Sequence, residues 1–496
     1  MNSNNKSRST KRSLYRGQHP VLAAVFESVA TPRDLLLVPV DYAKGTHMAL
    51  IADGTGRELR QAFEVENSAA GVEFLLKAIR KTAKRRKIPL ARVIVSGEDL
   101  PAYCENFARH IALAGPLMTR VSARLAAKER ENLGTTTDKL ALDCIAKVLI
   151  SRRAMPVPAS ADENGIYREL RDIVRERSDM VDATTATGNR IHTRVDVLLP
   201  GFLDSSRSLL SSFTGASLEL MEERFSGAQV ARRRRAALEK LLRRHHVHEV
   251  PETAEAILAL AQDALPADPV RLPSLQRSLT ALVRLRRNLS VTSRAMESEA
   301  ALLLATTPYA LLTSIGGVGF VLASGTAAEL GSPASLPSTD SMCAYAGIVP
   351  GTLQSGGPQG EAFHTSPSRA CNHHLKNWTV QAAQKIRLYG QPELKDRMIR
   401  WEANGQHAAF AGARRYLRLT RSLVTWGVPY LDPEGRPGRK GVTTADKARA
   451  AEAAFDTMVR KWKKIPGGID AAFAEDAPIG RWAETARQLF GAHLEL

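Results

Sequence analysis

Apolar and polar positions alternate along residues 34–150 in an order that predicts short strands and longer helices. Segments 34–41 and 46–53 are rich in β-branched and apolar residues, and segment 57–65 alternates with period two. Three strands are therefore predicted, with a Gly-Thr-Gly turn at 54–56 between the last two. Segment 71–87 follows with an apolar stripe at helical spacing, and Asn67 or Ser68 can cap this helix.

The rest of this region continues the alternation. We predict a buried strand over 91–97, a helix over 102–115, a short strand over 116–123 and a last helix over 138–154. Three strands, a helix, a strand, a helix, a strand and a helix form the order of the ribonuclease H fold. Residues 33–160 are thus predicted to be an α/β domain of the ribonuclease H-like, or RuvC-like, class.

Strand patterns largely disappear after about residue 162. Long charged segments with Leu, Val and Ile at helical spacing predict a helical insert or coiled-coil arm over 161–300. One helix is predicted through 231–246, where Arg232 and Arg233 belong to a run of four arginines. This run is either a solvated helix face or a contact with nucleic acid.

A compact, mostly helical segment is predicted over 305–390, followed by a basic helical extension over 391–496 that an exposed linker at 431–441 interrupts. Gly316, Gly317 and Gly319 precede a predicted helix in the manner of a helix-hairpin-helix turn. In such a turn glycine lets a phosphate approach the backbone N–H groups. The same pattern also fits an ordinary tight turn. The fold class predicted for the whole chain is α/β plus α.

The charge of the chain indicates its partner. Its 69 Lys and Arg against 51 Asp and Glu leave a net charge of +18, which favours nucleic acid. Residues 1–32 are predicted to be a basic disordered arm that meets a phosphate backbone. The four cysteines lack CxxC spacing, which argues against structural zinc and a disulfide framework. With neither a signal-peptide pattern nor a membrane-length apolar stretch, we expect a cytoplasmic protein without a membrane partner.

Acidic residues stand where the predicted elements end or begin. Asp41 and Glu98 follow strands that lie side by side at the centre of a ribonuclease H sheet, and Asp138 opens the last helix. Clustered carboxylates repel one another, so a fold that gathers them needs divalent cations such as Mg²⁺ or Mn²⁺. The pattern predicts a two-metal site that orients a water or hydroxyl at a phosphodiester.

Four motifs together resemble the bridge-RNA-guided insertion-sequence transposases of the IS110 family. They are VPVDYAK around Asp41, GEDLPAYCENF around Glu98, TDKLALDCIA around Asp138 and Asp143, and AYAGIVPGTLQSGG with Ser355. The resemblance covers about residues 33–150 and 308–390. It implies a DEDD domain in which these four acids bind metal, and a C-terminal domain whose Ser355 attacks DNA to form a phosphoserine-type linkage. Around Ser355, four residues would hold phosphates or DNA, or would lie on a helix that simply faces solvent: Arg369, Asn372, His373 and Lys376.

The chain departs from the family motif at one position. The motif puts two aspartates three positions apart on the last helix, but Ala141 stands three after Asp138 and the next acid is Asp143. At about 100° per residue, Asp143 points roughly 140° away from Asp138. Either Asp138 precedes the helix and both acids converge, or the site has only three carboxylates.

The leading hypothesis is a DNA recombinase that excises and inserts its own mobile element. A guide RNA would select the DNA sites, and the chain would act as a homo-oligomer, a dimer or tetramer, near the bacterial nucleoid. An alternative is a RuvC-like metal nuclease or DNA invertase that needs no RNA. A second alternative, which Ala141 supports, is an RNA-guided DNA-binding protein whose cleavage is impaired.

Overall fold

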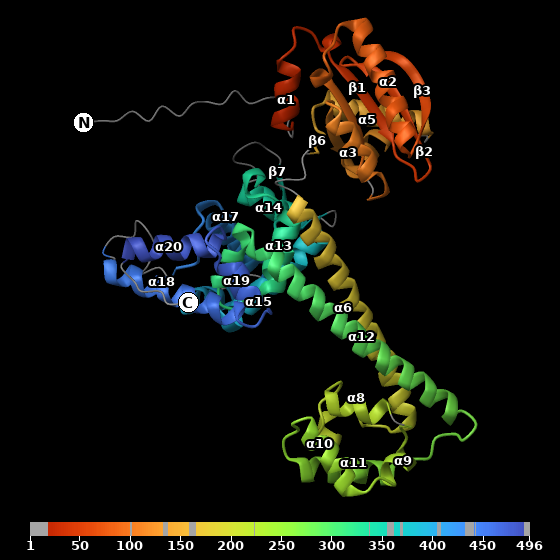
Figure 1. Cartoon of the computed structure of the whole chain (residues 1–496), viewed down its shortest axis with the longest axis vertical. Coiled ribbons are helices and arrows are strands. Elements are labelled where there is room, and N and C mark those ends of the chain that lie inside the picture. Colours follow the sequence, from red (N-terminus) through yellow and green to blue (C-terminus); the bar gives the residue numbers. More distant parts are fainter. Residues whose placement is uncertain are drawn as a thin grey trace. The chain divides into compact units, whose positions relative to one another are not determined.

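The computed structural model describes residues 18–99, 102–131, 137–157, 165–222, 224–336, 338–354, 362–367, 371–403, 408–431, 441 and 443–490. The chain divides into an N-terminal unit, residues 1–164, and a C-terminal unit, residues 165–496 (Figure 1).

A six-stranded mixed sheet forms the centre of the N-terminal unit. Its strands are β1 (Leu36–Asp41), β2 (Thr46–Asp53), β3 (Glu58–Glu66), β4 (Val93–Glu98), β5 (Leu117–Val121) and β6 (Met155–Pro156), in the spatial order β3-β2-β1-β4-β5-β6. β4 is parallel to β1 and β5, while β2 is antiparallel to β1 and β3, and β6 is antiparallel to β5. The predicted adjacency of the first and fourth strands is therefore confirmed.

Helices cover both faces of this sheet. α2 (Ala69–Arg86) and α3 (Glu105–Leu113) pack on one face through a core that includes Val38 and Val95. α1 (Pro20–Glu27), α4 (Ala123–Glu131) and α5 (Asp138–Ile150) pack on the other face with Leu37 and Ile94. Side chains alternate between the faces because successive residues of a strand point in opposite directions. Short 3₁₀ turns are η1 (Pro32–Asp34), η2 (Leu90–Arg92) and η3 (Ala102–Cys104).

Three elements of this unit were not predicted from the sequence: α1, α4 and the two-residue strand β6. Residues 20–27 were predicted within a disordered arm, but they form α1, whose Leu22 and Phe26 are buried in the core. That part of the prediction is wrong, because two apolar side chains one turn apart find a sheet face to cover. Residues 1–17 of the predicted arm lie outside the described residues. α4 is also unpredicted, since its charged sequence buries only Ala126.

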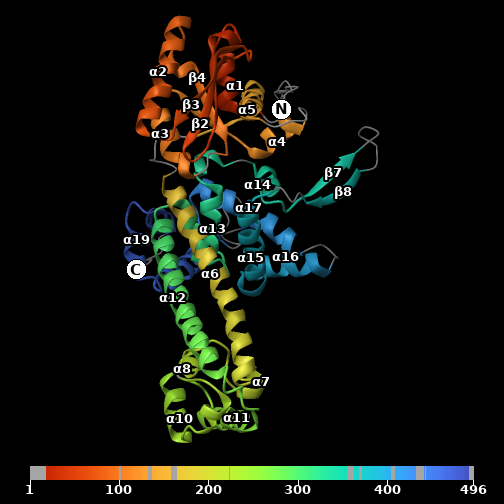
Figure 2. The same cartoon turned by 90° about the vertical axis from the view of Figure 1, so that its right-hand side faces the viewer.

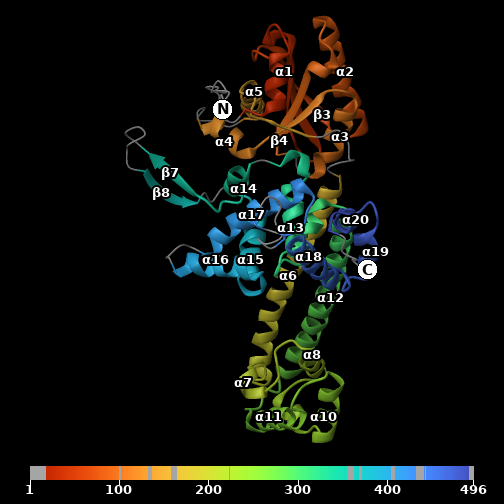
Figure 3. The same cartoon turned by 90° about the vertical axis from the view of Figure 1, so that its left-hand side faces the viewer.

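Two 34-residue helices, α6 (Gly165–Leu198) and α12 (Leu272–Ala305), run side by side in the C-terminal unit (Figures 2 and 3). They are antiparallel, since Arg177 pairs with Glu297 at 3.2 Å near one end and Arg194 donates to Ser278 at 3.3 Å near the other. A small helical core closes the far end. Its helices are α7 (Ser205–Ser208), α8 (Gly215–Glu222), α9 (Gly227–Ala231), α10 (Arg235–Arg244) and α11 (Val250–Asp263). The helical character predicted for this segment is confirmed, and its role as an insert or coiled-coil arm stays a prediction.

The prediction of one helix over 231–246 is wrong. α9 ends at Ala231, and α10 begins at Arg235 after an extended Arg234. A continuous helix would carry Arg234 on the stripe of Leu238 and Leu241, which are buried. The break leaves the Arg234 side chain exposed instead.

The larger core of the C-terminal unit joins the near ends of α6 and α12 to all later helices. These are η4 (Pro308–Ser314), α13 (Phe320–Leu330), η5 (Pro333–Ser335), α14 (Thr339–Tyr345), α15 (His373–Tyr389), α16 (Pro392–Ala403), α17 (Ala408–Trp426), α18 (Thr444–Trp462), α19 (Gly468–Phe473) and α20 (Pro478–Phe490). Between α14 and α15, β7 (Pro350–Gln354) and β8 (Ala362–Pro367) form a hairpin that projects from this body (Figure 2).

Residues after 390 are part of this core. Tyr416 and Trp462 are fully buried in it, and the Trp462 indole donates to Thr313 Oγ1 at 3.2 Å. The helices after residue 390 therefore fold together with the segment that was predicted as a separate domain. In the ranges that the structure describes, no helix has the length and apolar character required to cross a membrane.

Candidate active site

Asp41 and Glu98 lie level with each other at one edge of the N-terminal sheet. In the parallel pair of β1 and β4, Val40 is opposite Gly97, so the next residues, Asp41 and Glu98, end the two strands together. Leu37 and Ile94, which precede them by four residues on each strand, face the layer of α1, α4 and α5. Because side chains alternate along a strand, Asp41 and Glu98 belong to this same face.

A tight contact fixes the two strand ends in this register. Gly97 lies directly under the Tyr42 ring, and a Cβ added at Gly97 would come within 2.0 Å of that ring. Behind Tyr42, the buried His47 makes edge-on ring contacts with Tyr42 and Phe107, at centroid distances of 5.4 and 4.5 Å. Burial lowers the pKa of His47, so this ring stays neutral near pH 7. Glycine is therefore required beside Glu98.

α5 brings its first turn to the same edge. Its last residue, Ile150, approaches Gly56 in the β2–β3 turn, beside the amino end of β1. The 13 residues of α5 span about 20 Å at 1.5 Å per residue, the same length as the six residues of β1 at about 3.3 Å each. The helix therefore begins at the carboxyl end of β1, where Asp41 and Glu98 stand. Leu142, buried against Leu50 of β2, holds that end on the sheet.

The structure decides between the two arrangements predicted for Asp138 and Asp143. Thr137 is the N-cap of α5 and its hydroxyl accepts the Leu140 N–H, so Asp138 is the first helical residue. The arrangement in which Asp138 precedes the helix is wrong, and Asp143 lies about 140° around the helix from it. The position three after Asp138 is Ala141, which is buried.

Positive charge already neutralises one of the predicted acids. The Arg130 guanidinium of α4 forms an ion pair with Glu98, and both side chains are largely buried. Among the side chains that the structure describes, which exclude that of Asp138, no three His, Cys, Asp or Glu residues form a group that could hold a metal ion. The sequence prediction missed Arg130 because it missed α4, whose charged sequence has no apolar stripe.

The hairpin of the C-terminal unit presents the second predicted site. Gln354, the last residue of β7, pairs with Ala362, the first residue of β8, and segment 355–361 connects them. Ser355 belongs to that segment, and Arg369 follows β8. Both lie outside the described residues.

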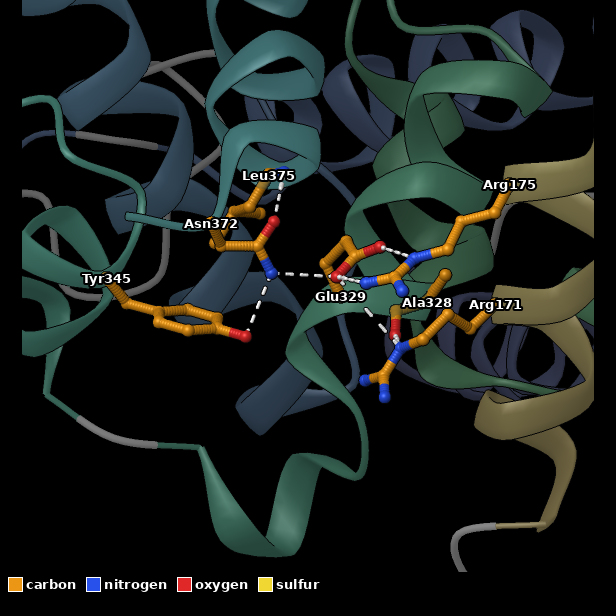
Figure 4. Close-up of polar contacts among 7 residues, drawn as sticks. All are labelled: Arg171, Arg175, Ala328, Glu329, Tyr345, Asn372 and Leu375. Carbon is orange, nitrogen blue, oxygen red and sulfur yellow. Dashed lines mark hydrogen bonds and ion pairs between the residues drawn. The ribbon is translucent and has the colours of Figure 1, made fainter. Parts of the chain in front are cut away.

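A buried carboxylate anchors the foot of this hairpin (Figure 4). Glu329 of α13 receives two hydrogen bonds from the Arg175 guanidinium of α6, both at 3.0 Å, and one from the Asn372 side-chain amide at 2.8 Å. The Asn372 amide also donates to the Tyr345 hydroxyl at 2.8 Å. Arg171 adds positive charge at 4.0 Å. We call these residues the Glu329 network.

The Glu329 network connects the two ends of the hairpin to the body of the unit. Tyr345 is the last residue of α14, just before β7, and Asn372 is the N-cap of α15, just after β8. Their backbones are joined directly, because the Asn372 N–H donates to the Tyr345 carbonyl at 2.8 Å. The Glu329 network therefore holds the two residues that flank the hairpin against α13 and α6.

Electrostatics keep Glu329 ionised. Burial by itself would raise the pKa of Glu329, but hydrogen bonds from Arg175 and Asn372 and the charges of Arg175 and Arg171 outweigh burial and lower it. The sequence prediction did not single out this residue. Its signal was present, since Glu329 is the one charged residue of α13.

Two family models match the chain over these regions. A model of the DEDD domain of IS110 transposases matches residues 38–200, and the model described as "Transposase IS116/IS110/IS902 family" matches residues 309–398. Together they span about half of the chain. The chain belongs to the IS110 family of transposases. Comparison with curated proteins gives no match.

The transposase is thus a DNA-transposing enzyme, and the two matches place its family domains on the structure. The first covers the sheet, α5 and α6, and DEDD domains of this kind typically use a divalent metal. The second runs from η4 into α16 and contains Glu329, Tyr345 and Asn372.

The turn that contains Gly316 and Gly317 packs tightly against the backbone of α15. A Cβ added at Gly316 or Gly317 would come within 2.3 Å of a carbonyl oxygen of α15, and Gly317 has a φ of +83°. The carbonyls of this turn and of the end of η4 accept three hydrogen bonds, of 2.5 to 2.8 Å, from the Lys461 ammonium. Burial, and to a lesser degree the positive charge of Arg460, lower the pKa of Lys461 to about 7. As predicted, α13 opens directly after Gly319.

The remaining predicted contacts with nucleic acid are dispersed over the C-terminal unit. His373 is exposed at the first position of α15, and Lys376 lies 5.6 Å from the Phe410 ring centroid. Arg232 is exposed after α9, and Arg233 is half-buried. Binding by these residues and by Gly317 and Gly319 stays a prediction.

Proposed function

We propose that this transposase cuts and rejoins the DNA of its own mobile element with the aid of a guide RNA. In this proposal Asp41, Glu98 and Asp138 hold Mg²⁺ or Mn²⁺, and Ser355 is the nucleophile. The observation that supports it best is the convergence of two strand ends, in register and on one face, with the first turn of α5. Such an edge gathers oxygen ligands of the kind that Mg²⁺ prefers.

The proposed reaction exchanges one phosphoester bond for another. The Ser355 hydroxyl oxygen bonds to phosphorus while the bond between phosphorus and a deoxyribose oxygen breaks, and the hydroxyl proton ends on the leaving oxygen. A bound divalent cation would neutralise the phosphate oxygens. The acids supply negative charge to hold that cation, and the hairpin, anchored by the Glu329 network, carries the serine. Asp143 would bind the same cation only if α5 rotated about its axis, since Asp143 points away from Asp138.

A guide RNA belongs to the proposal because the chain is basic and has no recognisable sequence-reading module such as a zinc finger. Base pairing would then select the site, while the protein contacts the backbone. A homo-oligomer, dimer or tetramer, would bring two DNA ends together. We expect RNA to copurify with the transposase. We also expect site-specific cleavage to be lost once that RNA is removed. Undiminished activity on a defined target without RNA would favour a metal nuclease or invertase.

Two substitutions test the roles of the acids and the serine. Asp41→Asn should abolish strand cleavage and leave DNA binding nearly unchanged, and Asp34→Asn, in η1 just before β1, is the matched control. Ser355→Ala should eliminate the covalent protein–DNA adduct, whereas Ser366→Ala on the same hairpin should retain it. An adduct that persists without Ser355 would place the nucleophile elsewhere.

Ala141 favours a second candidate, an RNA-guided DNA-binding protein with impaired cleavage. Its buried methyl group occupies the helical position of the fourth family acid. Measured strand cleavage by the unaltered chain separates the two, because an impaired protein would bind its target without cutting it.

A further inference from the structure

An arginine-lined cleft lies between α14 and α17 in the C-terminal unit. Its volume is about 290 Å³, and its walls include Arg397, Arg414, Arg415 and Arg418, together with Asp340 and Val349. Of the described residues that line it, Asp340 alone is acidic. The cleft is therefore a concentration of positive charge at one place on the surface of this unit.

Two of these arginines have surroundings that differ from those of Arg397. Arg397 pairs with Glu393 at 3.0 Å, but Arg414 and Arg418 are exposed and form no ion pair with any residue that the structure describes. They are four positions apart on α17, so they stand one turn apart on the same side of the helix. Like charges at this spacing destabilise a helix, and an anion held between them would remove that cost. The planar guanidinium groups suit the paired oxygens of a phosphate.

The position of the cleft connects it to the hairpin. Val349 in its wall is followed at once by β7, which begins at Pro350. Gln354, the last described residue of β7, is five residues further on, about 16 Å along an extended strand. At 3.4 Å per nucleotide along one strand of B-form DNA, that distance is roughly five nucleotides. Figure 3 shows the hairpin leaving the body beside α14 and α17.

We propose that the arginine cleft binds the phosphate backbone of the DNA strand that is cut, about five nucleotides from the phosphate that meets the hairpin. The proposal rests on the proposed function, because the hairpin is assigned the nucleophile there. DNA is favoured over RNA because the cleft adjoins the strand that leads directly into segment 355–361. The cleft fixes the position of the strand and does not read its sequence.

The variant Arg414→Gln/Arg418→Gln tests this site, because both side chains are exposed and glutamine preserves the helix. Lys463→Gln/Lys464→Gln is the matched control. It removes the same charge from two exposed positions of the same unit that do not line the cleft. Binding of each protein to a 40-base-pair duplex that carries the element's end is measured by fluorescence anisotropy between 50 and 200 mM NaCl.

Each lost phosphate contact should lower the slope of log affinity against log salt by about 0.9, so the cleft variant should lose about 1.8. At 100 mM salt its affinity should fall roughly 10- to 100-fold, while the lysine control stays close to the unaltered chain. Neutral methylphosphonates placed about five nucleotides from the cut should weaken the unaltered chain and not the cleft variant. Equal slopes for all three proteins would overturn the proposal. Loss of the copurified RNA with unchanged DNA binding would also overturn it, by assigning the cleft to RNA.

These results are independent of the serine. DNA binding and its salt dependence are measured without cleavage, so they still decide the proposal if Ser355→Ala retains its adduct. In that event the proposed nucleophile fails and the phosphate site stands. If instead the cleft variant shows normal salt dependence and adduct formation requires Ser355, the phosphate site fails and the proposed nucleophile stands.

Discussion

Removal of the Glu329 charge should uncouple the hairpin from the body of the C-terminal unit. In Glu329→Gln the side chain keeps its volume, but the two bonds from Arg175 lose their ionic partner. Hydrogen bonds to charged groups contribute about 1.5–3 kcal/mol each. Because the Glu329 side chain is 1% exposed while that of Arg175 is 43% exposed, solvent recovers part of the arginine's loss. We expect the free energy of unfolding to fall by about 2–3 kcal/mol in urea titration.

A compensated variant separates stability from positioning. In Arg175→Met/Glu329→Leu both charges are absent, and replacing a buried ion pair by apolar groups is often neutral or stabilising. Stability should therefore recover, but Asn372 still lacks its bond to Glu329. We expect DNA strand transfer to remain at least about tenfold slower in this variant than in the unaltered chain. Full recovery of both stability and strand transfer would refute a positioning role.

The pH dependence gives a second measurement of the same network. The pKa of Glu329 is lower in the folded chain than in the unfolded chain. Its contribution to stability is therefore complete above the unfolded pKa, near 4.3, and is lost as the pH falls through the folded pKa. The stability difference between the unaltered chain and Glu329→Gln should close below about pH 4.

Glu297→Gln is the control for the strand-transfer measurement. It removes the ion-pair partner of Arg177, which lies away from the hairpin.

Three further predictions test other parts of the molecule. Arg130→Gln should lower the Mg²⁺ concentration for half-maximal DNA cleavage by about 10- to 30-fold, because an ion pair of about 1.5–2 kcal/mol no longer competes with Mg²⁺ for Glu98. A higher Mg²⁺ requirement in this variant would contradict competition between Arg130 and the metal. Lys461→Met should cost about 3 kcal/mol in urea unfolding, since three buried carbonyls lose their donor, and a loss below about 0.5 kcal/mol would show that water replaces it. Ala141→Asp should be destabilised without metal and should regain stability in Mg²⁺, seen as a thermal shift larger than that of the unaltered chain, if the added carboxylate joins that of Asp138. Equal shifts would place position 141 outside the metal site.

The sequence predicted the elements that carry the acids. The strand over 46–53 agrees with β2 at both ends, and Ser68, one of two predicted caps, is the N-cap of α2. Local periodicity and capping chemistry are sufficient for such elements. They were insufficient for α4, whose polar sequence buries one alanine. They also missed the break at residues 232–234, because a continuous helix there would carry Arg234 into the core, and the core is known only from the folded structure.

Glu329 shows what composition could and could not indicate. Its position as the one charge of its helix was visible in the sequence, but its partners are Arg175, 154 positions earlier, and Asn372, 43 positions later. No spacing rule connects residues so far apart. The arginine cleft is similar, since it forms only where α17 packs against α14.

By itself the sequence determined the order of β1 to β5 with α2, α3 and α5 in the N-terminal unit, the excess of positive charge, and which acids end β1 and β4. These follow from local patterns and composition, which need no tertiary contact. Only the tertiary structure decided that Arg130 pairs with Glu98, and that the segments after residue 390 share the core of α13. The physical reason is that burial and charge pairing depend on contacts between residues distant in the chain, and folding alone selects those contacts.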